Sequence, residues 1–121
     1  MRLENKSILV SGVGKGMGSA IGLLFAQEGA NVALVARKPD VIKPLADTIE
    51  KLGRKAITIV ADSTNEGEIG AAAQQSAEIL GKIDGLVSLP GGGFRHVNDA
   101  IDMEAEFLES MFKNHLMSIF Y

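Results

Sequence analysis

The stretch "SILVSGVGKGMGSAIG", residues 7–22, places five glycines directly behind a short apolar run. The run is typical of a buried strand, and the residues behind the glycines have the spacing of a helix. Glycines in a strand-to-helix turn let the backbone approach a ligand closely because they carry no Cβ, and the helix start directs amide groups at an anion. The stretch therefore predicts a phosphate-binding turn. The alternative is a turn whose glycines serve only tight packing of strand and helix.

The spacing of the glycines limits which type of phosphate-binding loop the turn can be. Gly12, Gly16 and Gly18 follow the pattern G-x-x-x-G-x-G, which differs from the G-x-G-x-x-G of the ordinary dinucleotide fold. A P-loop would need Gly-Lys followed by Ser or Thr, whereas Lys15 is followed by Gly16. The turn is therefore neither of these two common phosphate-binding loops.

Short apolar runs alternate with helical patterns along the whole chain. The runs, which predict strands covered on both faces, are 7–10, 31–36, 56–61 and 84–89. Three apolar stripes predict helices, each closed by a glycine at Gly29, Gly53 or Gly81. The stripes consist of Ala20, Ile21, Leu24 and Phe25, then Val41, Leu45, Ile49 and Leu52, then Ile69, Ala73, Ala77 and Leu80. This alternation predicts a parallel sheet between two layers of helices, in one domain over residues 1–121.

The sequence also predicts where the third helix starts and where a fourth helix lies. Ser63 and Glu66 have the spacing of a capping box at the start of the third helix. A fourth helix is predicted from about Asp102 to Tyr121, the last residue.

Composition limits the function classes. The net charge of −3 and the pI near 5.3 give no basic surplus for a nucleic acid, and the absence of cysteine excludes disulfides and thiolate metal sites. His115 has no partner at metal-ligand spacing and His96 lies in a predicted loop, so both are expected to be structural or solvated and no metal site is expected. The sequence shows neither a signal-peptide core nor an apolar run that could span a bilayer, so a soluble, cytoplasmic protein is expected.

At several of these positions the chain resembles the short-chain dehydrogenase/reductase family. "SGVGKGMG" is similar to the family's T-G-x-x-x-G-x-G turn with Ser11 for Thr, and "VALVAR", "VADSTNE" and "IDGLVSLPGG" resemble its second, third and fourth strands. "FLESMFKNHL" resembles the helix that carries the family's structural and catalytic Asn. The resemblance covers the first half of a typical member. It implies a Rossmann-like, truncated doubly wound fold with strand order 3-2-1-4, and a dinucleotide-binding domain that is incomplete relative to the family.

The resemblance also implies a set of functional residues. The positions expected to bind the cofactor are Ser11, Gly12, Lys15, Gly16, Met17, Gly18, Arg37, Asp62, Ser63, Ser88 and Gly91. Asp62 corresponds to the Asp that contacts adenine, although an Asp that initiates the helix near a cap at Ser63 is the alternative. Asn114 corresponds to the family's catalytic Asn, and a surface Asn is the alternative there.

Charge at the end of the second strand predicts which cofactor is used. Folds that prefer NAD place a carboxylate there for the ribose hydroxyls, and that carboxylate would repel a 2′-phosphate. This chain has Arg37 and Lys38 instead, with Lys15 in the glycine turn. NADP(H) is therefore predicted over NAD(H), the alternative being that these cations only form a solvated strand end.

The chain also departs from the family. Its N-N-A-G turn is replaced by Ser88, Leu89, Pro90 and Gly91, and the catalytic Ser and Tyr-x-x-x-Lys have no counterpart, since no Lys follows Tyr121. The leading hypothesis is therefore the NADP(H)-binding half of an oxidoreductase, catalytically incomplete as this chain. A non-enzymatic nucleotide-binding or self-assembling module is the alternative. An S-adenosylmethionine-dependent methyltransferase is a third hypothesis, but it expects an acid where Arg37 stands.

Self-association is expected from the same departures. The fourth strand would expose its edge, and the last helix carries Phe107 and Met111 at helical spacing. A homodimer or tetramer through either surface is predicted. The alternative is that the last residues fray and residues 90–100 fold back over the strand edge.

Overall fold

Strands and helices alternate along the chain in the computed structural model, which describes residues 1–89, 105, 106 and 109. The elements are β1 (Ser7–Ser11), α1 (Met17–Gln27), β2 (Asn31–Ala36), α2 (Pro39–Lys51), β3 (Ala56–Val60), α3 (Glu66–Leu80) and β4 (Gly85–Ser88). They confirm the four predicted strands and the first three predicted helices. Of the predicted fourth helix only Ala105, Glu106 and Glu109 are described, and all three are helical.

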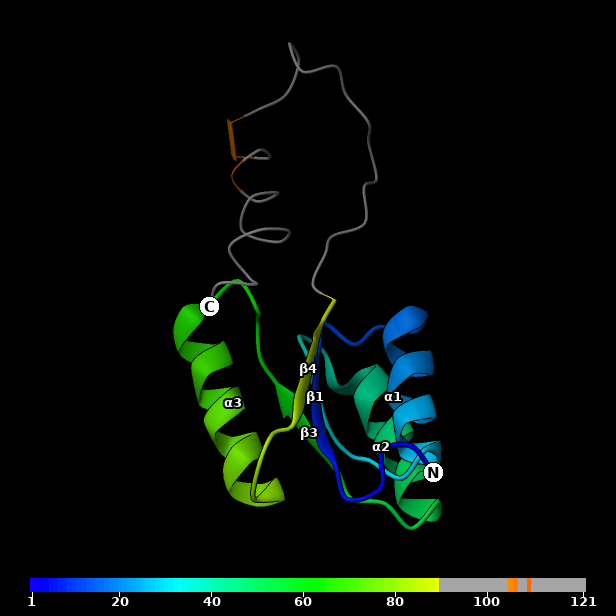
Figure 1. Cartoon of the computed structure of the whole chain (residues 1–121). Helices are drawn as coiled ribbons and strands as arrows, with labels where there is room; N and C mark the ends of the chain where they lie inside the picture. Colours follow the sequence, from blue (N-terminus) through cyan, green and yellow to red (C-terminus); the bar gives the residue numbers. More distant parts are fainter. Residues whose placement is uncertain (90–104, 107–108, 110–121) are drawn as a thin grey trace.

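The four strands form one parallel sheet in the order β3-β2-β1-β4, as predicted. At its carboxyl edge Ser11 of β1 lies opposite both Val35 of β2 and Ser88 of β4, and Ala36 of β2 lies opposite Val60 of β3. Because parallel strands all end at the same edge, the loops that follow them gather there. This is the end towards which the arrow of β4 points in Figure 1.

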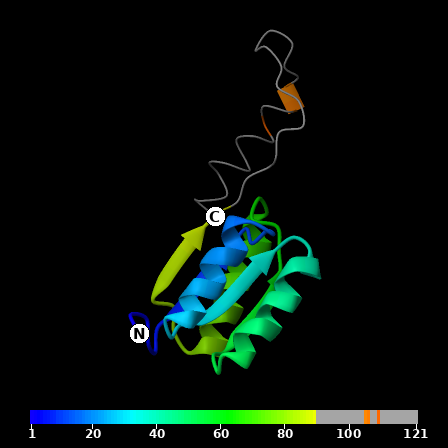
Figure 2. The ribbon, with the colours of Figure 1, turned by 90° about the vertical axis from the view of Figure 1, so that its right-hand side faces the viewer.

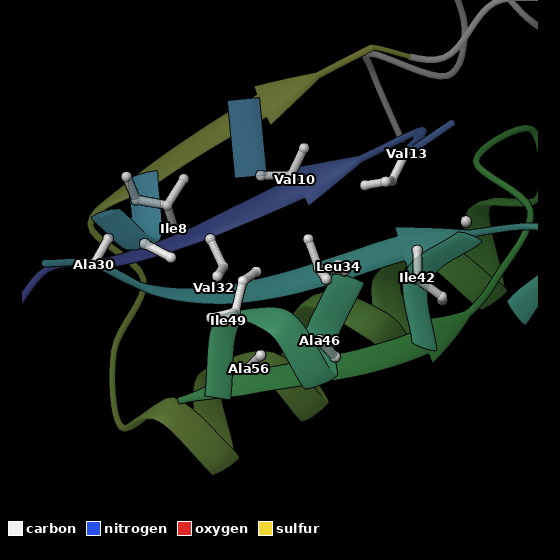
Figure 3. Close-up of a cluster of buried hydrophobic side chains, with 12 residues drawn as sticks. Ile8, Val10, Val13, Ala30, Val32, Leu34, Ile42, Ala46, Ile49 and Ala56 are labelled. Carbon is white, nitrogen blue, oxygen red and sulfur yellow. The ribbon is translucent and has the colours of Figure 1, made fainter. Parts of the chain in front are cut away.

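Helices cover both faces of the sheet, which confirms the predicted three layers. The helices α1 and α2 lie on one face and α3 lies on the other (Figures 1 and 2). Alternate side chains of β2 supply both interfaces: Val32 and Leu34 belong to the core on the side of α1 and α2, shown in Figure 3, while Ala33 and Val35 belong to the core beneath α3. The central strands are therefore apolar on both faces, as their sequence indicated.

The helix α1 makes its closest packing through small residues, and of the predicted stripe Phe25 packs, partly buried, against the core. Its buried residues are Gly18, Gly22 and Ala26, whereas Leu24 is 55% exposed. A Cβ on Gly18 would lie 2.9 Å from the Cα of Val13. This close approach leaves no room for large side chains at the contact, so the predicted stripe holds at Phe25, which packs against the core, and is wrong at Ala20 and Leu24.

The buried faces of α2 and α3 overlap with the predicted stripes but are centred on neighbouring residues. The helix α2 buries Ile42, Ala46 and Ile49, and α3 buries Ile69, Ala72 and Ser76. Of the predicted stripes, Ile49 and Ile69 are buried and three more residues pack, partly buried, against the core, whereas Leu52 and Ala73 are exposed. These three residues are Val41, Leu45 and Leu80. Adjacent apolar residues such as 41–42 and 72–73 fit two neighbouring stripes equally well, and contact with the sheet selects between them.

Two glycines of the β1–α1 turn give a matched test of the close packing. Gly18→Ala should lower the free energy of unfolding by about 1–3 kcal/mol, because the added methyl overpacks the contact with the backbone of Val13. Gly14→Ala is the control, since a Cβ there would meet nothing within 4 Å. Urea denaturation followed by circular dichroism measures both. Equal stabilities of the two variants would contradict the packing described.

A carboxylate fixes β4 against β1 at the amino edge of the sheet. The side chain of Asp84 accepts a hydrogen bond from Ser7 N at 2.9 Å, and Asp84 N donates to Ser7 O at 2.8 Å. The Nζ of Lys82 lies 3.2 Å from the same carboxylate. The hydrogen bond from Ser7 lowers the pKa of Asp84, and the nearby lysine charges act in the same direction against desolvation.

This lowered pKa predicts an acid-sensitive contribution to stability. A carboxyl whose folded pKa lies below its unfolded value stabilises the fold above the unfolded pKa, and this contribution is lost as the pH falls through the folded pKa. At pH 7, Asp84→Asn should therefore be less stable than the parent chain, and the difference should shrink as the pH falls below about 4. Denaturant titrations across this range measure it. A difference that stays constant with pH would show that the charge of Asp84 contributes nothing.

Candidate functional site

The turn between β1 and α1 is held at both of its ends. Gly12 has a φ of +84°, a conformation that favours glycine, and the amides of Gly12 and Val13 both donate to the carbonyl of Val35, at 2.9 and 3.1 Å. At the other end the hydroxyl of Ser19 donates to the carbonyl of Gly14. The middle of the turn, residues 14–17, is exposed. The backbone is thus fixed while its outer surface stays open.

No packing contact within the described part of the chain requires a glycine at position 16. A Cβ on Gly14 or Gly16 would meet nothing within 4 Å, and neither residue has the positive φ seen at Gly12. Gly18, by contrast, is required by its contact with Val13. The space above Gly16 is therefore available to a ligand that must approach the backbone closely.

The amino terminus of α1 suits an anion. Gly16 is its N-cap residue, and among the described residues no side chain caps the helix and no acidic residue lies in its first turn. The first amide groups of a helix have no partner within the helix, and its dipole places a partial positive charge there. A phosphate bound at this position would satisfy both. The residues present therefore fit the phosphates of a nucleotide.

Three cations surround this edge of the sheet. Lys15 is exposed in the turn, and Arg37 and Lys38 are exposed directly after β2, the strand next to β1. The positive charge of Arg37 is close enough to Asp62, after β3, to lower the pKa of that carboxyl. The sequence-predicted residues of the second and third strands are thus brought together at one edge.

The carboxylate of Asp62 accepts hydrogen bonds from Thr64, and Asp62 is not the N-cap of α3. Its Oδ1 accepts hydrogen bonds from Thr64 N at 2.9 Å and from Thr64 Oγ1 at 2.7 Å. The hydroxyl bond and then the amide bond are the main causes that lower the pKa of Asp62. The capping box predicted at Ser63 and Glu66 is wrong. Asn65 is the N-cap of α3, and its Oδ1 accepts a hydrogen bond from Glu68 N at 3.0 Å.

The remaining predicted residues lie partly at this edge and partly outside the described residues. Ser11 is buried, and its carbonyl accepts a hydrogen bond from the amide of Leu89, just after Ser88, at 2.8 Å. Met17 is 70% exposed at the start of α1. Gly91 and Asn114 lie outside the described residues, so their roles stay predictions.

Sequence reasoning missed the carbonyl of Val35, Thr64 and Asn65. No sequence pattern marks a backbone carbonyl that accepts two amides. Thr64 and Asn65 belong to "DSTN", residues 62–65, in which every side chain can cap a helix or close a turn. The sequence therefore marked this segment as a cap or turn, but it did not indicate which of the four residues takes which role.

Comparison with known protein families identifies the family to which this fold and turn belong. The sequence profile of the family described as short chain dehydrogenase matches residues 6–121. The chain belongs to this family. The match is inconsistent with the methyltransferase hypothesis, and it agrees with the strand order and the position of the glycine turn.

Individual short-chain dehydrogenases support the assignment. The 7alpha-hydroxysteroid dehydrogenase of Escherichia coli is 37% identical over 93 residues, which are 77% of this chain and 36% of that protein. A crystal structure of hydroxysteroid dehydrogenase from Escherichia coli has a TM-score of 0.89 and 32% identity, covering 98% of this chain and 49% of the other. The short chain dehydrogenase of Burkholderia cenocepacia in complex with NADP has a TM-score of 0.89 and 30% identity, covering 99% and 49%. The chain thus spans about half the length of these structures.

Proposed function

We propose that the chain binds a nicotinamide dinucleotide and forms the cofactor-binding half of an oxidoreductase. The observation that carries the proposal is the open turn over Gly16, which leads into a helix start without a side-chain cap or an acidic first turn. In this proposal the pyrophosphate lies against Gly12, Gly16, Met17 and Gly18, at the amino terminus of α1.

The other predicted residues take the remaining parts of the cofactor. Asp62 and Ser63 contact the adenine end, while Ser11, Ser88 and Gly91 line the ends of β1 and β4. The bound cofactor supplies hydride transfer. In the whole protein, Asn114 takes part in the catalytic machinery. Among the described residues no observation favours the non-enzymatic module.

A substitution in the open turn tests dinucleotide binding. Gly16→Val should weaken binding of NADPH at least about tenfold, because the added side chain fills the space over the turn, while the fold is retained since nothing in the described chain lies within 4 Å. Gly70→Val is the matched control, because Gly70 is an exposed glycine of α3 whose Cβ would also meet nothing. Titration calorimetry measures the affinities, and circular dichroism checks the fold.

Two results would contradict the proposed function. Unchanged affinity of Gly16→Val would show that the ligand does not approach this turn. Failure of the unmodified, folded chain to bind either NADPH or NADH would remove dinucleotide binding itself.

We further propose that NADP(H) is preferred over NAD(H). Arg37 and Lys38 follow β2 and are exposed, and no carboxylate occupies that strand end. Lys15 lies in the turn after the neighbouring strand. Guanidinium and ammonium groups at this edge suit a 2′-phosphate, with Arg able to bind it through two parallel hydrogen bonds. The NADP complex of the Burkholderia cenocepacia relative agrees with this preference.

A charge reversal tests the preference. Arg37→Asp should favour NADH over NADPH, a change of about 1–3 kcal/mol in relative binding free energy, since a charge-assisted bond is replaced by repulsion. Arg54→Asp is the control for the same change in net charge, because Arg54 precedes β3 at the opposite edge of the sheet and its guanidinium contacts the sulfur of Met1. Calorimetry with both cofactors measures the ratio. Equal ratios in the two variants would contradict a role for Arg37.

The expected homo-oligomer and cytoplasmic location stay predictions. In the described sheet β4 is an edge strand, and its Leu86 is 62% exposed, which agrees with a surface that a second copy could cover. The last helix, the other predicted contact surface, lies largely outside the described residues. No helix in the described part of the chain is long and apolar enough to cross a membrane.

A further inference from the structure

Thr64 directs two hydrogen bonds at a single oxygen of Asp62. Both its amide and its hydroxyl donate to Oδ1, and within the described part of the chain Oδ2 accepts no hydrogen bond. Asp62 follows Ala61, whose amide donates to the carbonyl of Ala36 at 3.0 Å and so continues the pairing of β3 with β2. The carboxylate therefore stands at the carboxyl edge of the sheet with one oxygen occupied and one available.

We propose that Thr64 is a positioning residue for the adenine end of the cofactor, which it serves by holding the Asp62 carboxylate so that Oδ2 accepts a hydrogen bond from the adenine amino group. This inference rests on the proposed function. Without the hydroxyl bond, only the Thr64 amide holds Oδ1, so the carboxylate of Asp62 has more rotational freedom, and fixing it on binding costs more conformational entropy. With it, the acceptor is oriented before the ligand arrives.

The role of Thr64 is separable from the formation of α3. Asn65 caps the helix, through its bond with Glu68 N, and Asn65 N donates to the carbonyl of Asp62 at 3.0 Å. The turn after β3 is thus closed by backbone bonds and by Asn65, and the hydroxyl of Thr64 contributes only its bond to the carboxylate. Removing the hydroxyl leaves both the cap and the backbone turn in place.

The negative charge of Asp62 also suits a hydrogen bond from the adenine amino group. Hydrogen bonds from Thr64 lower the pKa of Asp62, and the charge of Arg37 contributes in the same direction. The carboxyl is therefore ionised at neutral pH and can only accept hydrogen bonds, which matches a ligand group that can only donate. An amino group on an adenine ring is such a donor, whereas the carbonyl oxygen at the same position of hypoxanthine is an acceptor that a carboxylate repels.

A comparison of adenine with hypoxanthine isolates this contact. The affinities of NADPH and of its hypoxanthine analogue are measured for the unmodified chain, Thr64→Val and Thr64→Ser. Thr64→Val should weaken NADPH binding about five- to tenfold and hypoxanthine binding less than about twofold, so that the ratio between the two narrows. Thr64→Ser keeps the hydroxyl and should restore the ratio.

An NMR titration of the Asp62 carboxyl gives a second measurement that needs no ligand. Its pKa should rise towards the ordinary value in Thr64→Val and stay low in Thr64→Ser. Thr64→Ala, which lacks the hydroxyl and is not β-branched, replaces Thr64→Val if that variant is poorly folded.

Three results would overturn the proposal. An equal loss of both ligands in Thr64→Val would assign Thr64 to the fold alone. An unchanged pKa of Asp62 would show that the hydroxyl does not orient the carboxylate. Absence of binding of any dinucleotide to the unmodified chain would overturn the proposed function as well, which separates that failure from the first two.

Discussion

The contact between Gly18 and Val13 sets the position of α1, and with it the shape of the site. Since a Cβ on Gly18 would lie 2.9 Å from the Cα of Val13, the first turn of α1 packs against the residues after β1 too closely for any side chain at this position. The positive φ of Gly12 and the two amides that share the Val35 carbonyl fix the other side of the turn. The helix start consequently faces the carboxyl edge of the sheet, where its amide groups can meet an anion.

The two edges of the sheet carry different kinds of polar contact. At the amino edge, Asp84 uses its carboxylate on Ser7 and Lys82, so its charge serves the pairing of β4 with β1. At the carboxyl edge, Asp62 is held by a neighbour in sequence and keeps one oxygen without a hydrogen bond in the described chain. A parallel sheet makes this division possible because every strand begins at one edge and ends at the other. The division between the two edges is the reason that Asp84, at the amino edge, has a structural role, whereas we propose that Asp62, at the carboxyl edge, binds the ligand.

The sequence predicted the architecture well and the contacts less well. Apolar runs of four to six residues, separated by glycine-closed helical patterns, were sufficient for the strands, the layers and, with the family resemblance, the strand order. The buried faces of the helices were predicted only in part, because adjacent apolar residues allowed two stripes and because the close approach of α1 selected Gly22 and Ala26 over Leu24. In "DSTN" four residues of similar chemistry competed for two roles, and only the hydrogen bonds of the folded chain assign the cap to Asn65 and the carboxylate contact to Thr64.

The central claim is that the open turn and the start of α1 hold the phosphates of a dinucleotide. Backbone amide chemical shifts of the isotope-labelled chain, recorded during titration with NADPH, test it most directly. The account predicts that the largest changes fall on residues 12–19, with further changes at Arg37 and at residues 62–64, and that Ser7 and Asp84 at the opposite edge are unaffected. Changes confined to the amino edge, or none at saturating cofactor, would contradict it.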